Sequence, residues 1–185
     1  EVWITYGHDD EGQAAPTLSM ARAVSPDGSS QDLELEEVEG GLLATVSIEE
    51  EGCYILDLEK EPRFTDMEWF GITGPASLIL EYGRALLPAV TGENSARTSK
   101  VGLEIVPAVD PSRIEAGTTF EAQATWEGDP IGGDYSAIKV RSPEDLLVVQ
   151  HAGAVDLSGS SPDGAEEFEI PSPGLWVVTF EATVE

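Results

Sequence analysis

Residues Val101 to Gly117 read VGLEIVPAVDPSRIEAG, and this stretch divides the chain. It opens as a strand, because Val101, Leu103 and Ile105 alternate with the residues between them. Pro107 cannot donate to a strand ladder, and Pro111 repeats the interruption. A turn ending at Gly117 precedes a strictly alternating run, FEAQATW. We therefore expect two strand-rich halves, 1–100 and 101–185, joined by a short proline-stiffened connector.

The pattern of the second half is the clearer one. The runs around 120–126, 138–140, 146–151 and 174–184 read as strands, and residues 158–164 read as a loop. About seven short strands without a helix are typical of an immunoglobulin-like sandwich. The first half has acidic, turn-punctuated strands that suit a second sandwich. The expected fold class is all-β, with two consecutive immunoglobulin-like β-sandwich domains.

Two parts of the first half are less regular. We expect a strand over 2–6, a loop over 8–11, and further strands up to residue 61. Residues 75–90 are ambiguous, because apolar residues at 78, 79, 82 and 86 suit a short helix whereas Gly83 favours a strand. The four tryptophans are expected to anchor the cores, and Cys53 to be a small buried hydrophobe.

The charge excludes some partners. The chain has 36 acidic against 9 basic residues among 185, a formal net charge of −27. Such a charge argues against binding nucleic acid or anionic lipid, because both need cationic patches. It suits either a solvated acidic surface adapted to salt or the capture of cations. The lone cysteine excludes an intrachain disulfide, and no apolar run reaches the length of a membrane span.

No motif indicates an enzyme. The sequence lacks the nucleophile elbow, the paired-histidine zinc motif, the phosphate loop and the dinucleotide fingerprint. With two histidines and one cysteine, it offers few arrangements for a catalytic triad. Adjacent carboxylates do not indicate a general acid and base, because neighbouring acidic residues are common in so acidic a chain. We expect a non-enzymatic protein.

Several fragments together resemble one family. These are Trp3-Ile4-Thr5-Tyr6-Gly7-His8, the stretch LEIVPAVDP from Leu103, the glycine-to-proline tract 117–130, and Asp163-Gly164 followed by Pro173-Gly174-Leu175-Trp176. Their order is similar to that of exported accessory proteins of nickel and cobalt uptake, which accompany energy-coupling-type transporters. The resemblance implies a two-sandwich protein of the periplasm or cell envelope. It also implies membrane-embedded nickel/cobalt transporter subunits as partners, and a histidine directly before the position of Glu1.

The resemblance points to one metal site. His8 is the residue that it carries over, and Asp9 and Asp10 follow His8 in the sequence. Imidazole and carboxylate ligands suit Ni²⁺ or Co²⁺. The alternative is a solvated loop histidine in an acidic protein, and His151 is expected to be structural or on the surface. The alternative function is an extracytoplasmic adhesive or scaffolding β-sandwich module without a metal.

Overall fold

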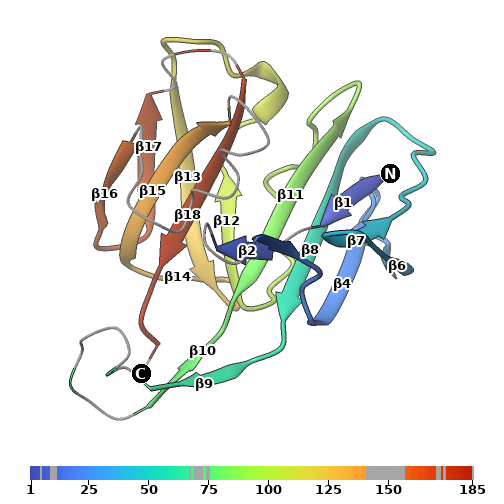
Figure 1. Cartoon of the computed structure of the whole chain (residues 1–185). Helices are drawn as coiled ribbons and strands as arrows, with labels where there is room; N and C mark the ends of the chain where they lie inside the picture. Colours follow the sequence, from blue (N-terminus) through green and yellow to red (C-terminus); the bar gives the residue numbers. More distant parts are fainter. Residues whose placement is uncertain are drawn as a thin grey trace.

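The computed structural model is built almost entirely of antiparallel strands (Figure 1). It describes residues 1–4, 6–8, 12–66, 68, 73, 76–140, 157–169, 172 and 174–184. Within these residues there is no α-helix, and no helix is long and apolar enough to cross a membrane. The expected all-β, sandwich-type fold class is confirmed.

The first half contributes eleven of the described strands. They are β1 (Val2–Ile4), β2 (Tyr6–His8), β3 (Gly12–Ala14), β4 (Leu18–Val24), β5 (Ser30–Asp32), β6 (Leu35–Val38), β7 (Gly41–Ala44), β8 (Gly52–Lys60), β9 (Arg63–Thr65), β10 (Ser77–Ile79) and β11 (Tyr82–Ala89). The main sheet has the order β11-β8-β4-β5, and β1, β7 and β6 form a second sheet. The strand expected over 2–6 was given too early an end, because β2 continues through Gly7 to His8.

Strand β8 is the centre of the first half. Six consecutive residues, from Gly52 to Asp57, are buried, so both faces of the strand are covered. On one face Cys53 and Ile55 pack with Val24 of β4 and Leu86 of β11. Within the ambiguous segment 75–90, Ser77 to Ile79 form β10, which pairs with β9, and Tyr82 to Ala89 form β11, which pairs residue by residue with β8. Tertiary pairing thus selects the strand over the helix.

The second half forms two facing sheets. Its strands are β12 (Leu103–Pro107), β13 (Thr119–Trp126), β14 (Asp129–Pro130), β15 (Gly133–Val140), β16 (Leu157–Ser161), β17 (Ala165–Glu169) and β18 (Leu175–Glu181). β12, β13, β14 and β17 make one sheet, and β16, β15 and β18 make the other. A cavity of about 10 Å³ lies between them, lined from both sheets by residues including Ala124 and Phe180. The loop expected over 158–164 was wrong in its first part, because β16 pairs with β15.

Asp110 lies in the proline connector, which links β12 to β13. These two strands pair in one sheet, so the segment does not itself join the two halves as expected. The carboxylate of Asp110 accepts from the backbone N–H of Ser112 at 2.8 Å and from the Ser112 hydroxyl at 2.6 Å. It is therefore the N-cap of the 3₁₀-helix η2 (Pro111–Arg113), with proline at the favoured first position. The same carboxylate accepts from the N–H of Gly92, 3.2 Å away, which follows β11. The division into domains 1–100 and 101–185 stays a prediction.

Candidate functional site

His8 lies at the end of a short hairpin. The register of β2 and β3 pairs Tyr6 with Ala14, Gly7 with Gln13 and His8 with Gly12. His8 is thus the last paired residue before the connection to β3, which holds Asp9 and Asp10 in the sequence. The backbone of His8 belongs to a strand, so its expected place in a loop was wrong.

The other candidate residues fall elsewhere. Asp9, Asp10, His151 and Trp69 lie outside the described residues, as does the expected strand 146–151. Over the part of the chain that the structure describes, no three histidine, cysteine or acidic side chains are grouped so that they could hold a metal ion. For the candidate site, the structure therefore gives the position of the His8 backbone, and the sequence gives the residues that follow it.

Trp3 is not the core anchor that its residue type indicates. Its side chain is 58% exposed, although the indole nitrogen lies close above Gly41. A Cβ at Gly41 would come within 2.4 Å of that nitrogen, so glycine leaves room for one edge of the ring while the rest faces solvent. Trp126 and Trp176 are partly buried.

A row of charges, buried except for the partly exposed Arg22, crosses the main sheet of the first half. The registers place Arg22 of β4 and Arg84 of β11 directly opposite Asp57 of β8, on either side of it. Arg84 Nε donates to Asp57 at 2.9 Å, and Arg22 Nη2 lies 3.3 Å from the same carboxylate. The row is next to the apolar cluster on the same face, because residues two apart on a strand share a face.

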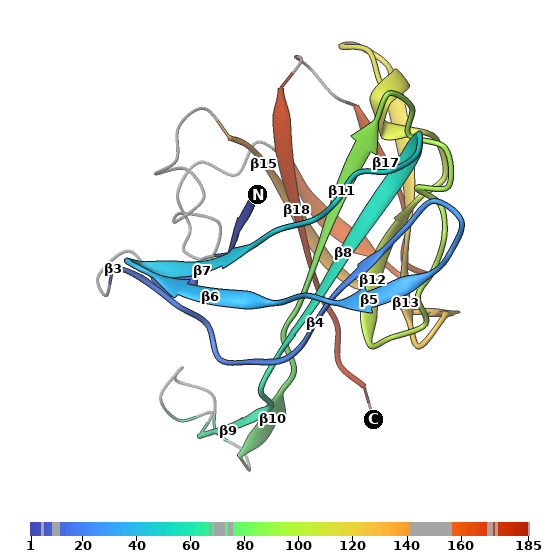
Figure 2. The ribbon, with the colours of Figure 1, turned by 90° about the vertical axis from the view of Figure 1, so that its right-hand side faces the viewer.

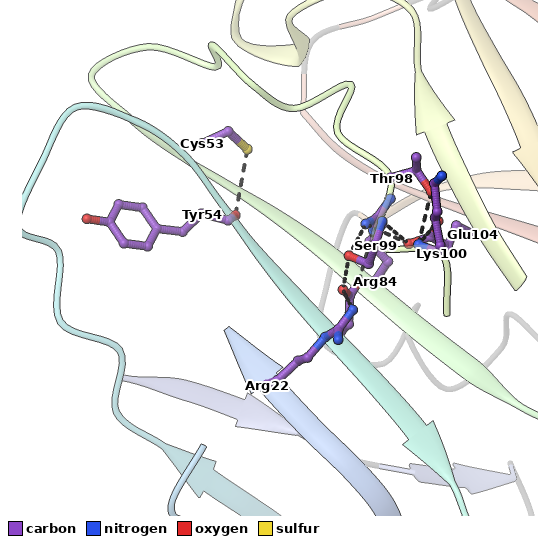
Figure 3. Close-up of polar contacts among 9 residues, drawn as sticks. Arg22, Cys53, Tyr54, Arg84, Thr98, Ser99, Lys100 and Glu104 are labelled. Atoms are coloured by element: carbon purple, nitrogen blue, oxygen red, sulfur yellow. Dashed lines mark hydrogen bonds and ion pairs between the residues drawn. The ribbon is translucent and has the colours of Figure 1, made fainter. Parts of the chain in front are cut away.

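This row continues into the second half through Glu104 of β12 (Figure 3). Arg84 Nη2 donates to Glu104 at 2.9 Å and also to the Ser99 hydroxyl, which in turn donates to Asp57. Glu104 further accepts from the backbone N–H of Ser99 at 2.8 Å, from the N–H of Lys100 at 3.2 Å and from the Thr98 hydroxyl. We call Arg22, Asp57, Arg84, Ser99 and Glu104 the seam.

The seam holds two sheets together through buried ion pairs. The side chains of Arg84 and Asp57 are each 8% exposed, and that of Glu104 is 3% exposed. Two guanidinium groups balance two carboxylates, which is the condition under which buried charges are tolerated. Tyr82 lies two residues before Arg84 on β11, and its ring makes an edge-to-face contact with Trp126 at a centroid distance of 6.0 Å. Together these contacts fix β11 against the sheet that contains β12 and β13.

Sequence reasoning missed the seam. Asp57 interrupts the apolar run CYIL-D-L, and Glu104 lies inside the strand LEIVP. A charged residue at a strand position whose neighbours indicate burial is a signal for a buried ion pair, because unpaired charges are rarely buried. A chain with 9 basic residues offers few partners for two such carboxylates, but only the strand registers identify Arg22 and Arg84.

Cys53 is where its residue type indicates. It is 1% exposed, and burial raises the pKa of its thiol above the ordinary value. A thiol that is buried and protonated is a poor nucleophile and a poor metal ligand. The expectation of a small buried hydrophobe is confirmed.

Comparison with known proteins gives one match. The sequence profile of a family described as a domain of unknown function (DUF4198) matches residues 1–184. No curated protein and no solved structure matches the chain. The description of the family gives no activity.

Proposed function

The chain belongs to the DUF4198 family, and we propose that it is a non-enzymatic metal-binding accessory protein of a nickel or cobalt uptake system. It is exported and works in the periplasm or cell envelope. The residues that take the metal are His8, Asp9 and Asp10. The proposal rests on the sequence resemblance and on one structural observation.

That observation is the register of the β2–β3 hairpin. His8 pairs with Gly12, which leaves three residues, 9–11, to join the strands. All three are acidic, being Asp9, Asp10 and Glu11. The imidazole-bearing residue thus ends a paired strand directly before a connection made of carboxylates. A mixed nitrogen and oxygen ligand set suits Ni²⁺ and Co²⁺, and the thiol that softer ions prefer is buried at Cys53.

The charge of the chain supports uptake of a cation. A formal charge of −27 raises the local concentration of divalent cations around the surface and speeds their arrival. One imidazole with solvated carboxylates makes an open site, so binding is expected to be weak and reversible. Such a site suits transient delivery to membrane-embedded nickel/cobalt transporter subunits, the proposed partners. Nucleic acid and lipid are not partners in this proposal.

Titration calorimetry with Ni²⁺ and Co²⁺ tests the proposal. We expect His8→Ala to weaken binding at least tenfold, and Asp9→Asn/Asp10→Asn to weaken it by a smaller factor. The matched control is His151→Ala, which removes the other histidine and leaves affinity unchanged. Adding a histidine before Glu1, as the resemblance implies, should tighten binding in a His8-dependent way. Equal affinity of the parent and the His8→Ala protein would overturn the assignment.

The seam favours a second candidate function. A buried ion-pair network that fixes β11 against β12 suits an adhesive or scaffolding module, in which rigid geometry matters. This alternative needs no metal. It would gain support if neither Ni²⁺ nor Co²⁺ bound the chain at concentrations up to about 1 mM. A Kd of 1 mM corresponds to a binding free energy of about −4 kcal/mol.

A further inference from the structure

The β9–β10 hairpin extends beyond the main sheet as an arm. It continues the ribbon of β8 and β11, and it appears beyond the other strands in both views (Figures 1 and 2). β4 pairs with β8 only as far as Lys60, and β9 and β10 form a two-stranded sheet by themselves. At the root of the arm Glu81 accepts from Lys60 at 2.8 Å and lies 3.5 Å from the Arg63 guanidinium.

The arm exposes an apolar pair. Phe64 of β9 is 78% exposed and Leu78 of β10 is 49% exposed. The register places them directly opposite each other, so both side chains lie on the same face. A two-stranded hairpin has no core of its own and is marginally stable in water. A large apolar pair on such a hairpin therefore marks a contact surface.

The charge around the pair restricts the occupant. Residues 59–81 contain five carboxylates and two cationic side chains, and both cations lie against Glu81. Glu61, Asp66 and Glu68 are exposed. Anionic lipid is repelled by this rim, and a second copy of the chain carries the same −27 charge. The complementary surface is an apolar pocket rimmed by lysine and arginine.

We infer that the β9–β10 arm docks, through Phe64 and Leu78, into an apolar pocket rimmed by basic residues on a protein partner. This inference goes beyond the proposed function, because it holds whether or not His8 binds a metal. The carboxylates of the arm steer the encounter and set its salt dependence, and the apolar pair supplies the affinity.

The test uses a probe that shares the chemistry of the partner surface, an apolar face flanked by cationic side chains. The probe is a fluorescein-labelled helical peptide of leucine and lysine with one apolar face, and its control is the same composition scrambled so that the face is lost. Binding to the whole chain is followed by fluorescence anisotropy with a chelator present, so the result does not depend on the metal site. Circular dichroism checks that each variant is folded.

We expect Phe64→Ser/Leu78→Ser to weaken binding of the amphipathic peptide at least tenfold, because two apolar side chains lose their burial. Ile48→Ser, at a residue 53% exposed outside the arm, is the matched control and should stay within twofold. The scrambled peptide should also bind the parent protein weakly. Its affinity should not exceed that of the amphipathic peptide for the Phe64→Ser/Leu78→Ser variant. Equal binding of both peptides, or equal binding by the double variant, would reduce the effect to general charge and overturn the inference.

A second variant gives an independent readout. Leu78→Cys can be labelled selectively with an environment-sensitive fluorophore, since Cys53 is buried. Its emission should shift to the blue when the amphipathic peptide is added. Two other outcomes would overturn the inference: a blue shift with phosphatidylcholine vesicles in place of the peptide, or Phe64-dependent self-association in sedimentation velocity.

Discussion

Arg84 bridges two carboxylates that come from strands of two different sheets. Its guanidinium donates at 2.9 Å to Asp57 on β8 and at 2.9 Å to Glu104 on β12. All three side chains are more than nine-tenths buried. The contact ties the first half of the sequence to the second by charge as well as by packing, and it makes the relative placement of β11 and β12 sensitive to one side chain.

Replacing Arg84 should therefore be costly. Arg84→Met leaves Asp57 with the more distant Arg22 and removes the only guanidinium that the described residues place against Glu104. Removing one partner of a buried pair costs about 3–5 kcal/mol. Urea unfolding should show that loss in the free energy of unfolding. Arg113→Met, which breaks a pair whose arginine is 73% exposed, is the control and should cost less than about 1 kcal/mol.

Much of the fold could be predicted, whereas the seam could not. The strict alternation of FEAQATW predicted β13, and the turn ending at Gly117 is formed. Leu78, Tyr82 and Leu86 fitted two periods, and only the pairing of β10 with β9 and of β11 with β8 decided between them. The row Arg22–Asp57–Arg84 depends on the registers of two strand pairs, which no local pattern contains. His8 could be singled out by residue type, but the sequence did not show that it belongs to a strand.

Salt should stabilise the chain as a whole. With 36 acidic residues against 9 basic ones, repulsion in the compact state is relieved when salt screens the charges. The Debye length falls from about 30 Å at 10 mM to about 3 Å at 1 M ionic strength. The unfolding midpoint in differential scanning calorimetry should rise over this range. A flat midpoint would show that the acidic residues are compensated locally, as Asp57 and Glu104 are.

One like-charge pair should account for a measurable part of the repulsion. Glu121 of β13 and Glu167 of β17 are both exposed and stand directly opposite each other in the register. Like charges in this position destabilise a sheet, and an opposite pair stabilises it by up to about 1 kcal/mol. Glu121→Lys should raise the midpoint at 10 mM salt by about 2–4 °C for each kcal/mol gained, and the gain should shrink at 1 M.

Glu36→Lys provides the control for this charge reversal. Glu36 is exposed on β6 and stands opposite Leu43, so its reversal changes the net charge by the same amount without removing a like-charge pair. A gain equal to that of Glu121→Lys would assign the effect to net charge alone.

Asp110 should make stability depend on acid pH. The hydrogen bond from the Ser112 hydroxyl, followed by those from the N–H groups of Ser112 and Gly92, holds the pKa of Asp110 below its ordinary value of 3.8. Because the pKa is lower in the folded state, its stabilisation is complete above the unfolded value and is lost as pH falls through the folded value. Asp110→Asn keeps a capping side chain but cannot ionise. The stability difference between parent and variant should therefore shrink as the pH is lowered from 7 to below 3.8.

A constant difference between the two proteins across that pH range would contradict the role of the Asp110 charge. Asp66→Asn is a suitable control. Asp66 is an exposed aspartate outside the connector, and its carboxylate also accepts a backbone N–H two residues on, from Glu68 at 3.0 Å.

The proposed metal site is tested most directly by locating the ion. Crystals of the protein soaked with Ni²⁺ should give an anomalous difference peak, recorded at the nickel absorption edge, within about 2.0–2.2 Å of an imidazole nitrogen of His8, the distance usual for a divalent transition metal and imidazole. The peak should be absent from crystals of His8→Ala treated in the same way. A nickel peak bound to other residues, with none at His8, would contradict the account.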